Sequence, residues 1–261
     1  MKIVVCVKHV PDAQSDRGFD SADNTADRES VDGLLSELDE YPVEEALKIR
    51  ESGEDAEIIV LTMGPAKAAD AVKKSLQMGA DQGVHISDDA LAGSDALATS
   101  LVLAEAIKKI GDVDLVLTGM ASTDGTMSVV PAMLAERLGL PQVTFASEVT
   151  LSSGSVQARR DGDVATEVIE ASLPLVLSVT DQINEPRYPS FKGIMAAKKK
   201  PVDTWSLSDI GVDAGQVGLD AAWTKVTNVT KRPPRQQGLI VSDDGQGGAV
   251  LAQFLSMQKF I

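Results

Sequence analysis

The chain has 261 residues, and its 39 acidic and 24 basic residues give a formal net charge of −15. Nucleic acid is a poor partner for so acidic a protein, because binding polyphosphate requires a net basic face. A single cysteine, Cys6, rules out an intramolecular disulfide and is compatible with a reducing cytoplasm. The opening segment is too short and too charged for a signal peptide, and no apolar run approaches the ~20 residues of a membrane span. We therefore expect a cytoplasmic α/β protein without direct membrane insertion.

The first part of the chain alternates between apolar, β-branched runs and helical patterns. Strands are predicted over 2–10, 57–62, 83–86 and 114–118, and helices over 42–53, 65–78, 95–110 and 127–138. Such an alternation indicates right-handed βαβ crossovers and a doubly wound, mostly parallel sheet covered on both faces. The acidic segment between Asp12 and Glu40 is predicted to be a long loop that is functional or partly disordered.

The alternation of strand and helix patterns ends after residue 143. Three short alternating segments, 144–151, 156–160 and 164–170, are separated by turn residues and predict antiparallel hairpin strands at the edge of the sheet. An apolar run over 175–179 then predicts a return to the core.

The next stretch, 181–201, reads DQINEPRYPSFKGIMAAKKKP. Two prolines, a glycine and the lack of a sustained period predict a long, solvent-facing loop. Its charge is basic within an acidic chain, and it carries Phe191, Ile194 and Met195. Composition alone leaves two interpretations open: a protein-docking surface, or a buried connector whose apolar residues lie under the domain.

Beyond this stretch the pattern weakens, so residues 1–201 are assigned to the α/β domain and 202–261 to a C-terminal extension. The last segment, 248–261, places apolar residues at helical spacing. This amphipathic tail is predicted to pack either on its own domain or on a partner.

Ligands of doubly wound sheets bind outside the carboxyl ends of the strands. The segment GMASTDGTM, residues 119–127, offers glycines, hydroxyls and backbone N–H groups to an anion, although caps of an ordinary strand-to-helix turn have the same composition. Neither a P-loop nor a GxGxxG fingerprint is present. With His9 and His85 far apart and one cysteine, no zinc or iron cluster is predicted, and Cys6 is interpreted as a small buried hydrophobe.

Several motifs together point to one family. In order they are VCVKHVPD, DEYPVEEALKIRE, LTMGPAKA, MGADQGVHI, STDGTMSVVPAMLAERLGLPQVTFASEV and PLVLSVTDQINEPRY, followed by an Ile-Met pair and a lysine run. The chain resembles the electron-transfer flavoprotein β subunit, of the bacterial, non-bifurcating type. The resemblance is strong over residues 1–201 and weaker beyond.

The resemblance implies an electron carrier subunit and not an enzyme. Its partners would be an α subunit that holds most of the FAD, the acyl-CoA and related dehydrogenases that supply electrons, and a membrane quinone oxidoreductase that accepts them. It also implies a structural AMP and a C-terminal arm that embraces the α subunit. The competing hypothesis is a stand-alone adenine-nucleotide sensor similar to universal stress proteins, although its glycine spacing is absent and it has no need of the basic loop.

The resemblance also assigns residues. The implied AMP-binding residues are Cys6, Ser36, Glu37, Leu38, Asp39, Met63, Asp124, Gly125, Thr126, Met127, Ser128, Val129, Val130, Pro131, Ala132, Met133, Leu134 and Ala135. The implied partner-docking residues are Asn184, Glu185, Pro186, Arg187, Tyr188, Phe191, Ile194, Met195, Lys198, Lys199 and Lys200. Glu167 resembles the glutamate that holds the mobile flavin domain, although an ordinary solvated strand glutamate is the alternative.

Two departures from the family pattern bear on the AMP site. Residues 36–38 are Ser-Glu-Leu where relatives often have Asn-Pro-Phe, and residues 129–131 are Val-Val-Pro where relatives often have Thr-Gly-Gln. Because Pro131 lacks a backbone N–H group, phosphate contacts are expected from residues 124–128.

Overall fold

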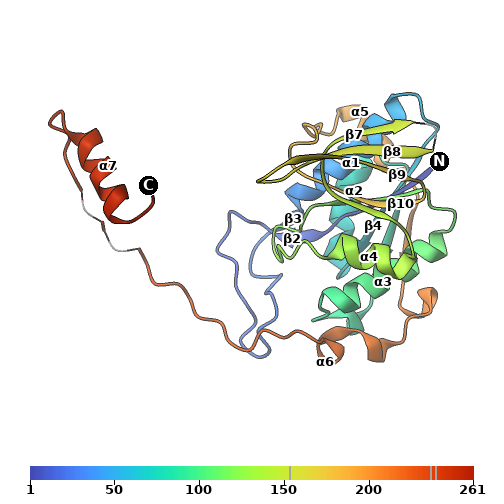
Figure 1. Cartoon of the computed structure of the whole chain (residues 1–261). Helices are drawn as coiled ribbons and strands as arrows, with labels where there is room; N and C mark the ends of the chain where they lie inside the picture. Colours follow the sequence, from blue (N-terminus) through green and yellow to red (C-terminus); the bar gives the residue numbers. More distant parts are fainter. Residues whose placement is uncertain (153, 236, 239) are drawn as a thin grey trace. The chain divides into compact units, whose positions relative to one another are not determined.

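The computed structural model describes residues 1–152, 154–235, 237–238 and 240–261. Its contacts divide the chain into two units, residues 1–227 and 228–261. The first unit, drawn in Figure 1, contains a nine-stranded sheet. Its strand order is β11-β5-β4-β1-β6-β10-β7-β8-β9. The strands are β1 (Lys2–Cys6), β4 (Glu57–Met63), β5 (Gln82–Ile86), β6 (Leu115–Gly119), β7 (Gln142–Ser152), β8 (Ser155–Asp161), β9 (Thr166–Ser172), β10 (Leu175–Val179) and β11 (Val202–Trp205).

The sheet is parallel from β11 to β7, and β8 and β9 extend it as antiparallel strands. Both predictions, a mostly parallel sheet and a hairpin extension at its edge, are confirmed. The chain moves outward from β1 through β4 to β5, and then crosses back to β6 on the other side of β1. The carboxyl ends of β1 and β6 therefore form the switch point at which doubly wound sheets bind ligands.

Helices cover both faces of the sheet. On one face, α1 (Glu37–Glu51) and α2 (Ala69–Met78) bury Val43, Leu47 and Leu76 against alternate strand residues. On the other face, α3 (Ala96–Ile110) and α4 (Val130–Leu138) bury Val102 and Leu134 against the remaining strand residues. The parallel strands are consequently apolar on both sides, as their continuous β-branched runs predict.

Two predicted boundaries near the N-terminus are wrong. The helix predicted to begin at Pro42 begins at Glu37, because Glu37, Asp39 and Glu40 form an acidic first turn that suits the positive end of a helix. The predicted first strand over 2–10 ends at Cys6, and the chain then forms β2 (His9–Pro11), which pairs with β3 (Gly33–Leu35) in a separate sheet. The predicted loop between Asp12 and Glu40 therefore contains a strand and the start of α1.

The predicted loop over 181–201 contains a helix, α5 (Phe191–Ala197), which corrects that prediction. Ser190 caps it, because its hydroxyl accepts a hydrogen bond of 3.0 Å from the Gly193 N–H. The helix packs beside α2. A helix of seven residues is too short to be stable alone, so it forms only because of this packing and the cap. Seven residues are also too few to show a helical period, which is why the sequence did not predict it.

The strand β11 lies beyond the expected domain boundary at residue 201. It pairs in parallel with β5, and Leu207, Ile210 and Val217 behind it join the core. The first unit thus continues to Thr227 and also includes the short helix α6 (Gly218–Ala221). The second unit contains the helix α7 (Gly247–Met257), which confirms the helical tail predicted from the apolar spacing. No helix among the described residues is both long and apolar enough to cross a membrane.

Candidate functional site

Three parallel strands end side by side at the switch point. Cys6 pairs in register with Leu61 of β4 and with Thr118 of β6. Because strand side chains alternate between faces, Cys6 and Thr118 point to the face covered by α3 and α4, and Met63 packs on this face as well. The two strand residues that the resemblance assigns to AMP, Cys6 and Met63, are therefore brought to the same face and edge of the sheet.

Two buried hydroxyls at this edge have no hydrogen-bond partner among the described residues: those of Thr62 and Thr118. Thr118 lies on the face of Cys6, and Thr62 lies on the opposite face with Val60. A buried polar group without a partner costs about 1–3 kcal/mol, so each one requires an explanation. Neither threonine was predicted, because a threonine in a β-branched strand carries no sequence signal of its own.

The N-terminus of α1 packs closely against the end of β6. A Cβ atom at Gly119 would lie 2.5 Å from the Leu38 carbonyl oxygen and 2.8 Å from a carboxylate oxygen of Asp39. The Asp39 carboxylate also accepts a hydrogen bond of 2.8 Å from the Lys8 N–H. Burial raises the pKa of Asp39 to about 7, although hydrogen bonds and the charge of Lys8 oppose the shift. The structure thus brings residues 36–39 and the β6 loop together, as the resemblance implies.

The loop after β6 is organised around Asp124. Its carboxylate lies 2.8 Å from the Lys8 ammonium and 3.2 Å from the Arg28 guanidinium, and it accepts a hydrogen bond of 2.7 Å from the Gly125 N–H. Burial acts to raise the pKa of Asp124, but Lys8 and Arg28, with Ser122, outweigh it and hold that pKa well below its usual value. Sequence reasoning named Lys8 only as part of the strand end 8–10 and did not foresee that Lys8 and Arg28 pair with Asp124, since each is about a hundred residues away from it.

The helix α4 begins at Val130, later than the predicted Met127, so residues 124–129 all belong to the loop. Thr126 and Ser128 adopt left-handed conformations, with φ of 50° and 58°. Leu134 and Ala135 are buried in the core, and Pro131 is buried in the first turn. Only the first part of the predicted 124–135 segment is therefore an accessible loop.

Cys6 is buried, and burial, assisted by the nearby Asp39 charge, raises the pKa of its thiol to about 12. It is therefore a neutral thiol, which confirms the interpretation as a small buried hydrophobe. No group of three metal-ligating side chains occurs in the part of the chain that the structure describes.

The second predicted site, the segment 184–200, separates into exposed and anchored residues. Tyr188 and Phe191 are 95% and 79% exposed, and Met195 and Ile194 are also exposed. The alternative of a buried connector is therefore wrong for its apolar residues. By contrast, the side chains of Asn184, Arg187 and Lys200 are all hydrogen-bonded to groups of the domain itself.

Glu167 lies on β9, the outermost strand of the hairpin extension, and is exposed. Its carboxylate lies 2.7 Å from the guanidinium of Arg160 on the neighbouring strand. A latch made by Glu167 would therefore have to exchange this exposed ion pair for another one.

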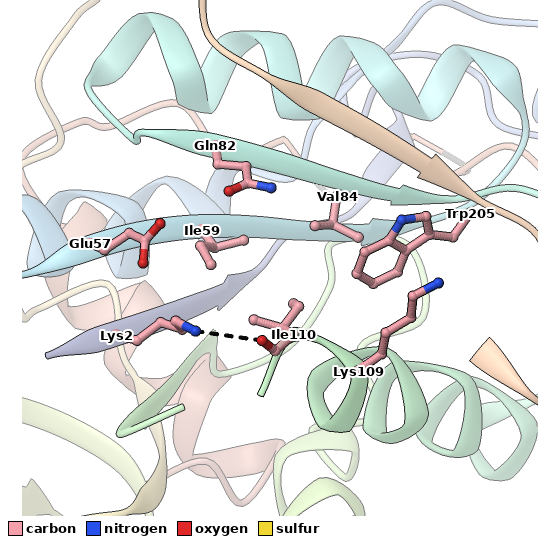
Figure 2. A pocket seen from close by; sticks show the side chains of 8 residues that line it. All are labelled: Lys2, Glu57, Ile59, Gln82, Val84, Lys109, Ile110 and Trp205. Carbon is pink, nitrogen blue, oxygen red and sulfur yellow. Dashed lines mark hydrogen bonds between the residues drawn. The ribbon is translucent and has the colours of Figure 1, made fainter. Parts of the chain in front are cut away.

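Two cavities lie outside these predicted sites. One, of about 190 Å³, is lined by side chains near the amino ends of β1, β4 and β5, with Lys109 4.3 Å above the ring of Trp205 (Figure 2). The Lys2 ammonium donates to the Ile110 carbonyl at the same cavity. The other, of about 200 Å³, lies beyond the carboxyl ends of β6 and β10 beside β7 and β8, and is lined by Phe145, whose φ is 60°. Neither was predicted.

The fold and its edge loops define an α/β protein of the doubly wound class, whose ligand edge is the carboxyl end of β1 and β6. The comparisons with known proteins narrow this class. The family model described as the electron transfer flavoprotein domain matches residues 23–210. The chain is 46% identical to the electron transfer flavoprotein subunit beta of Mycobacterium tuberculosis over 99% of both chains.

Two further relatives extend the comparison. The chain is 34% identical to the electron transfer flavoprotein subunit beta of Megasphaera elsdenii over 100% of both chains. It is 37% identical to the caffeyl-CoA reductase-Etf complex subunit CarD of Acetobacterium woodii, over 93% of this chain and 92% of that one. The chain belongs to the electron transfer flavoprotein family and is a β subunit, which implies an α-subunit partner and a role in carrying electrons.

Proposed function

We propose that this β subunit forms a heterodimer with its α subunit and lines part of an FAD site held mainly by that partner. Electrons would come from acyl-CoA and related dehydrogenases and pass toward a membrane quinone oxidoreductase. FAD supplies the redox chemistry in such a carrier, and the protein supplies binding, orientation and electrostatics. The cytoplasmic location expected from the sequence remains a prediction.

One observation supports this proposal above the others. The exposed apolar residues Tyr188, Phe191 and Met195 share one segment with the exposed cations Lys192, Lys198 and Lys199, in a protein of net charge −15. An apolar centre with a polar rim is typical of protein-docking surfaces. Its cations would accelerate encounter with an acidic partner face, and its apolar side chains would supply affinity.

We propose AMP as the small ligand at the switch point. The residues present fit an adenine nucleotide, because the edge offers the unpaired Thr118 hydroxyl and the loop 124–128, whose Asp124 is already paired with Lys8 and Arg28. A polar ligand would give the Thr118 hydroxyl the partner that the protein lacks. Residues 36–39, Cys6 and Met63 would enclose the ligand from the α1 side and the sheet.

AMP is proposed over a second FAD, and with it the non-bifurcating type. Bifurcating relatives typically carry a loop of the Asp-Gly-Asp-Thr type, whereas residues 124–127 here are Asp-Gly-Thr-Met and lack the second acidic residue. Mass spectrometry of the cofactors released from the purified heterodimer tests this choice. Two equivalents of FAD per heterodimer without AMP would refute it.

Co-expression with the α subunit tests the function as a whole. We expect a yellow heterodimer with flavin absorbance at about 450 nm. An acyl-CoA dehydrogenase and its substrate should reduce this flavin. A colourless, nucleotide-bound protein that does not pair with the α subunit would instead support the adenine-nucleotide sensor.

Glu167 is proposed as the latch for the flavin domain of the α subunit, through an arginine of that partner. Its existing pair with Arg160 joins an exposed carboxylate to a half-buried guanidinium at the surface. Exposed pairs of this kind contribute only about 0–1 kcal/mol, so exchanging one for another is easily reversible. This suits a contact that must form and release during electron transfer.

A further inference from the structure

The docking segment 184–200 is fixed at its start to helix α1. The Asn184 amide donates to the Tyr41 carbonyl at 3.1 Å and to the Glu45 carboxylate at 2.9 Å. Three residues later, the Arg187 guanidinium bridges two carboxylates of the same helix, Glu44 and Glu51.

The geometry of Arg187 uses the planar fork of a guanidinium. Its Nε and Nη2 lie 2.8 and 2.9 Å from the two oxygens of Glu44, and its Nη1 and Nη2 lie 2.6 and 2.9 Å from those of Glu51. Glu44 is buried, and Glu51 is half exposed. An ammonium is a point charge and cannot make both bidentate contacts.

The later part of the segment is fixed to helix α2. Gly193 of α5 lies so close to α2 that an added Cβ atom would collide with the Gln77 carbonyl oxygen. The Lys200 ammonium donates to three carbonyls at the C-terminal end of α2, those of Leu76, Gly79 and Ala80, at 3.1, 3.2 and 2.5 Å. These carbonyls lack partners within a helix, so Lys200 completes the helix end.

The two sets of side chains in this segment do not overlap. The side-chain N–H donors of Asn184, Arg187 and Lys200 bond to groups of the domain, whereas the side chains of Tyr188, Phe191 and Met195 are exposed and free for a partner. We propose that Asn184, Arg187, Gly193 and Lys200 are positioning residues that clamp α5 on α1 and α2, so that its apolar side chains are presented in a preformed docking geometry.

This inference rests on the proposed docking function, and it changes the role first assigned to three of the residues. Arg187, Asn184 and Lys200 hold the surface without touching the dehydrogenase. Holding a binding segment in its bound conformation lowers the ordering cost of association. Loosening the clamp therefore weakens docking although no contact residue changes.

The substitution Arg187→Lys separates the two roles, because it keeps the positive charge but loses the two-carboxylate bridge. In the complete heterodimer we expect the apparent KM for this protein in a dehydrogenase assay to rise at least about threefold, with kcat and flavin content unchanged. The salt dependence of the rate should stay that of the natural protein. The matched control is Lys73→Arg, which keeps the charge at an exposed position of α2 outside the docking segment and for which we expect no change.

A milder variant avoids leaving the buried Glu44 unpaired. Glu51→Gln removes half of the bridge at an exposed position, and Glu40→Gln removes an acid of the same helix that pairs with Lys74 instead. Both substitutions change the net charge equally, which makes Glu40→Gln the control for charge. Only Glu51→Gln removes a contact of Arg187, and therefore only Glu51→Gln should raise KM. Equal effects of the two would mean that charge alone is responsible, and would overturn the clamp.

Hydrogen exchange measures the clamp without any dehydrogenase. We expect Arg187→Lys, Glu51→Gln and Gly193→Ala to speed amide exchange in α5, while the Phe191→Ala and Ala196→Ser controls leave it unchanged. If Phe191→Ala raises KM but the clamp variants change neither KM nor exchange, the clamp is refuted and docking stands. If the clamp variants speed exchange while Phe191→Ala leaves KM unchanged, the segment does not dock a dehydrogenase through Phe191. The proposed docking function is then refuted, and so is the role of the clamp in docking.

Discussion

The two ends of helix α1 serve two regions that are built in opposite ways. At its N-terminus, the carboxyl edge of the sheet pairs its own charges, Lys8 and Arg28 with Asp124, but leaves the buried Thr118 hydroxyl without a partner. From Tyr41 to Glu51 the same helix holds the docking segment, which pairs the Arg187 guanidinium with Glu44 and Glu51 and leaves Tyr188 and Phe191 exposed.

The difference shows that what a region leaves unsatisfied indicates the chemistry of its ligand. An unpaired buried hydroxyl costs free energy that only a polar group of suitable size can recover. Exposed large apolar side chains cost free energy that another protein surface can recover. The first pattern fits a nucleotide and the second fits a protein, and the predictions below test this reasoning in order of decreasing effect.

The helix α7 extends the comparison to the second unit, because it leaves Val250, Leu251, Phe254 and Met257 exposed. Deletion from Gly248 onward should abolish stoichiometric co-purification with the α subunit. The expected loss is roughly 6 kcal/mol, since each of these four apolar side chains contributes about 1.5 kcal/mol when buried. Size-exclusion chromatography of the co-expressed pair is the measurement, with Gln253→Ala as the control. A truncated chain that still elutes as a heterodimer would contradict the prediction.

Asp39, at the carboxyl edge of the sheet, tests how burial affects the ionisation of a carboxylate at the proposed AMP site. Its pKa is raised to about 7 in the folded protein, chiefly by burial, and an unfolded chain releases this proton near pH 4. Its contribution to stability is therefore full below about pH 4 and is lost as the pH rises to about 7, on the order of 4 kcal/mol in all.

The variant Asp39→Asn does not titrate, so its stability relative to the natural protein should increase as the pH rises across that window. Denaturation of both heterodimers at about pH 4.5 and pH 7.5, with AMP in excess, measures the difference. Asp124, whose pKa is lowered, loses its contribution only as the pH falls below about 4, in both proteins alike. A difference in stability that does not vary with pH would show that Asp39 is ionised throughout.

Phe191 tests the docking segment directly. Truncation to alanine should cost about 2 kcal/mol of docking free energy, as for a central apolar anchor, and raise the apparent KM for the dehydrogenase roughly tenfold or more. Because the side chain is 79% exposed, thermal stability and flavin content should not change. The control Lys192→Ala should alter chiefly the salt dependence of the rate. Unaltered kinetics of a folded, FAD-containing Phe191→Ala heterodimer would remove the anchor assignment.

Much of the fold could be predicted because its signals are local. The helix α3 was bounded within one residue, since Asp95 caps its start and Gly111 follows its end. The alternation of strands and helices predicted the parallel sheet, and turn residues predicted the hairpin strands β7 to β9. The strand β11 was missed, because four residues that include an aspartate become a strand only by pairing with β5.

The candidate site was predicted only in outline, because its decisive features are not local. The resemblance supplied Asp124 and Arg187, but their partners lie far away in the sequence and are brought near only by the fold. Thr118 was missed for a different reason. Its residue type is ordinary for a strand, and only the full set of contacts shows that its hydroxyl has no partner.

The substitution Thr118→Val gives the finest test of the comparison, because it replaces the unpaired hydroxyl with a methyl group of nearly the same size. Without nucleotide, the variant should be more stable by about 1 kcal/mol, since a buried polar group without a partner has been removed. With AMP, the variant should lose about 1 kcal/mol of binding free energy, so that its Kd rises roughly fivefold.

The matched control is Thr62→Val, whose hydroxyl is equally unpaired but lies on the opposite face of the sheet. It should stabilise the protein by a similar amount without changing the Kd, and titration calorimetry of nucleotide-stripped heterodimers measures both. If both variants weaken AMP binding equally, or if neither does, then the Thr118 hydroxyl is not a ligand group, and an unpaired buried hydroxyl in this fold does not indicate where the nucleotide binds.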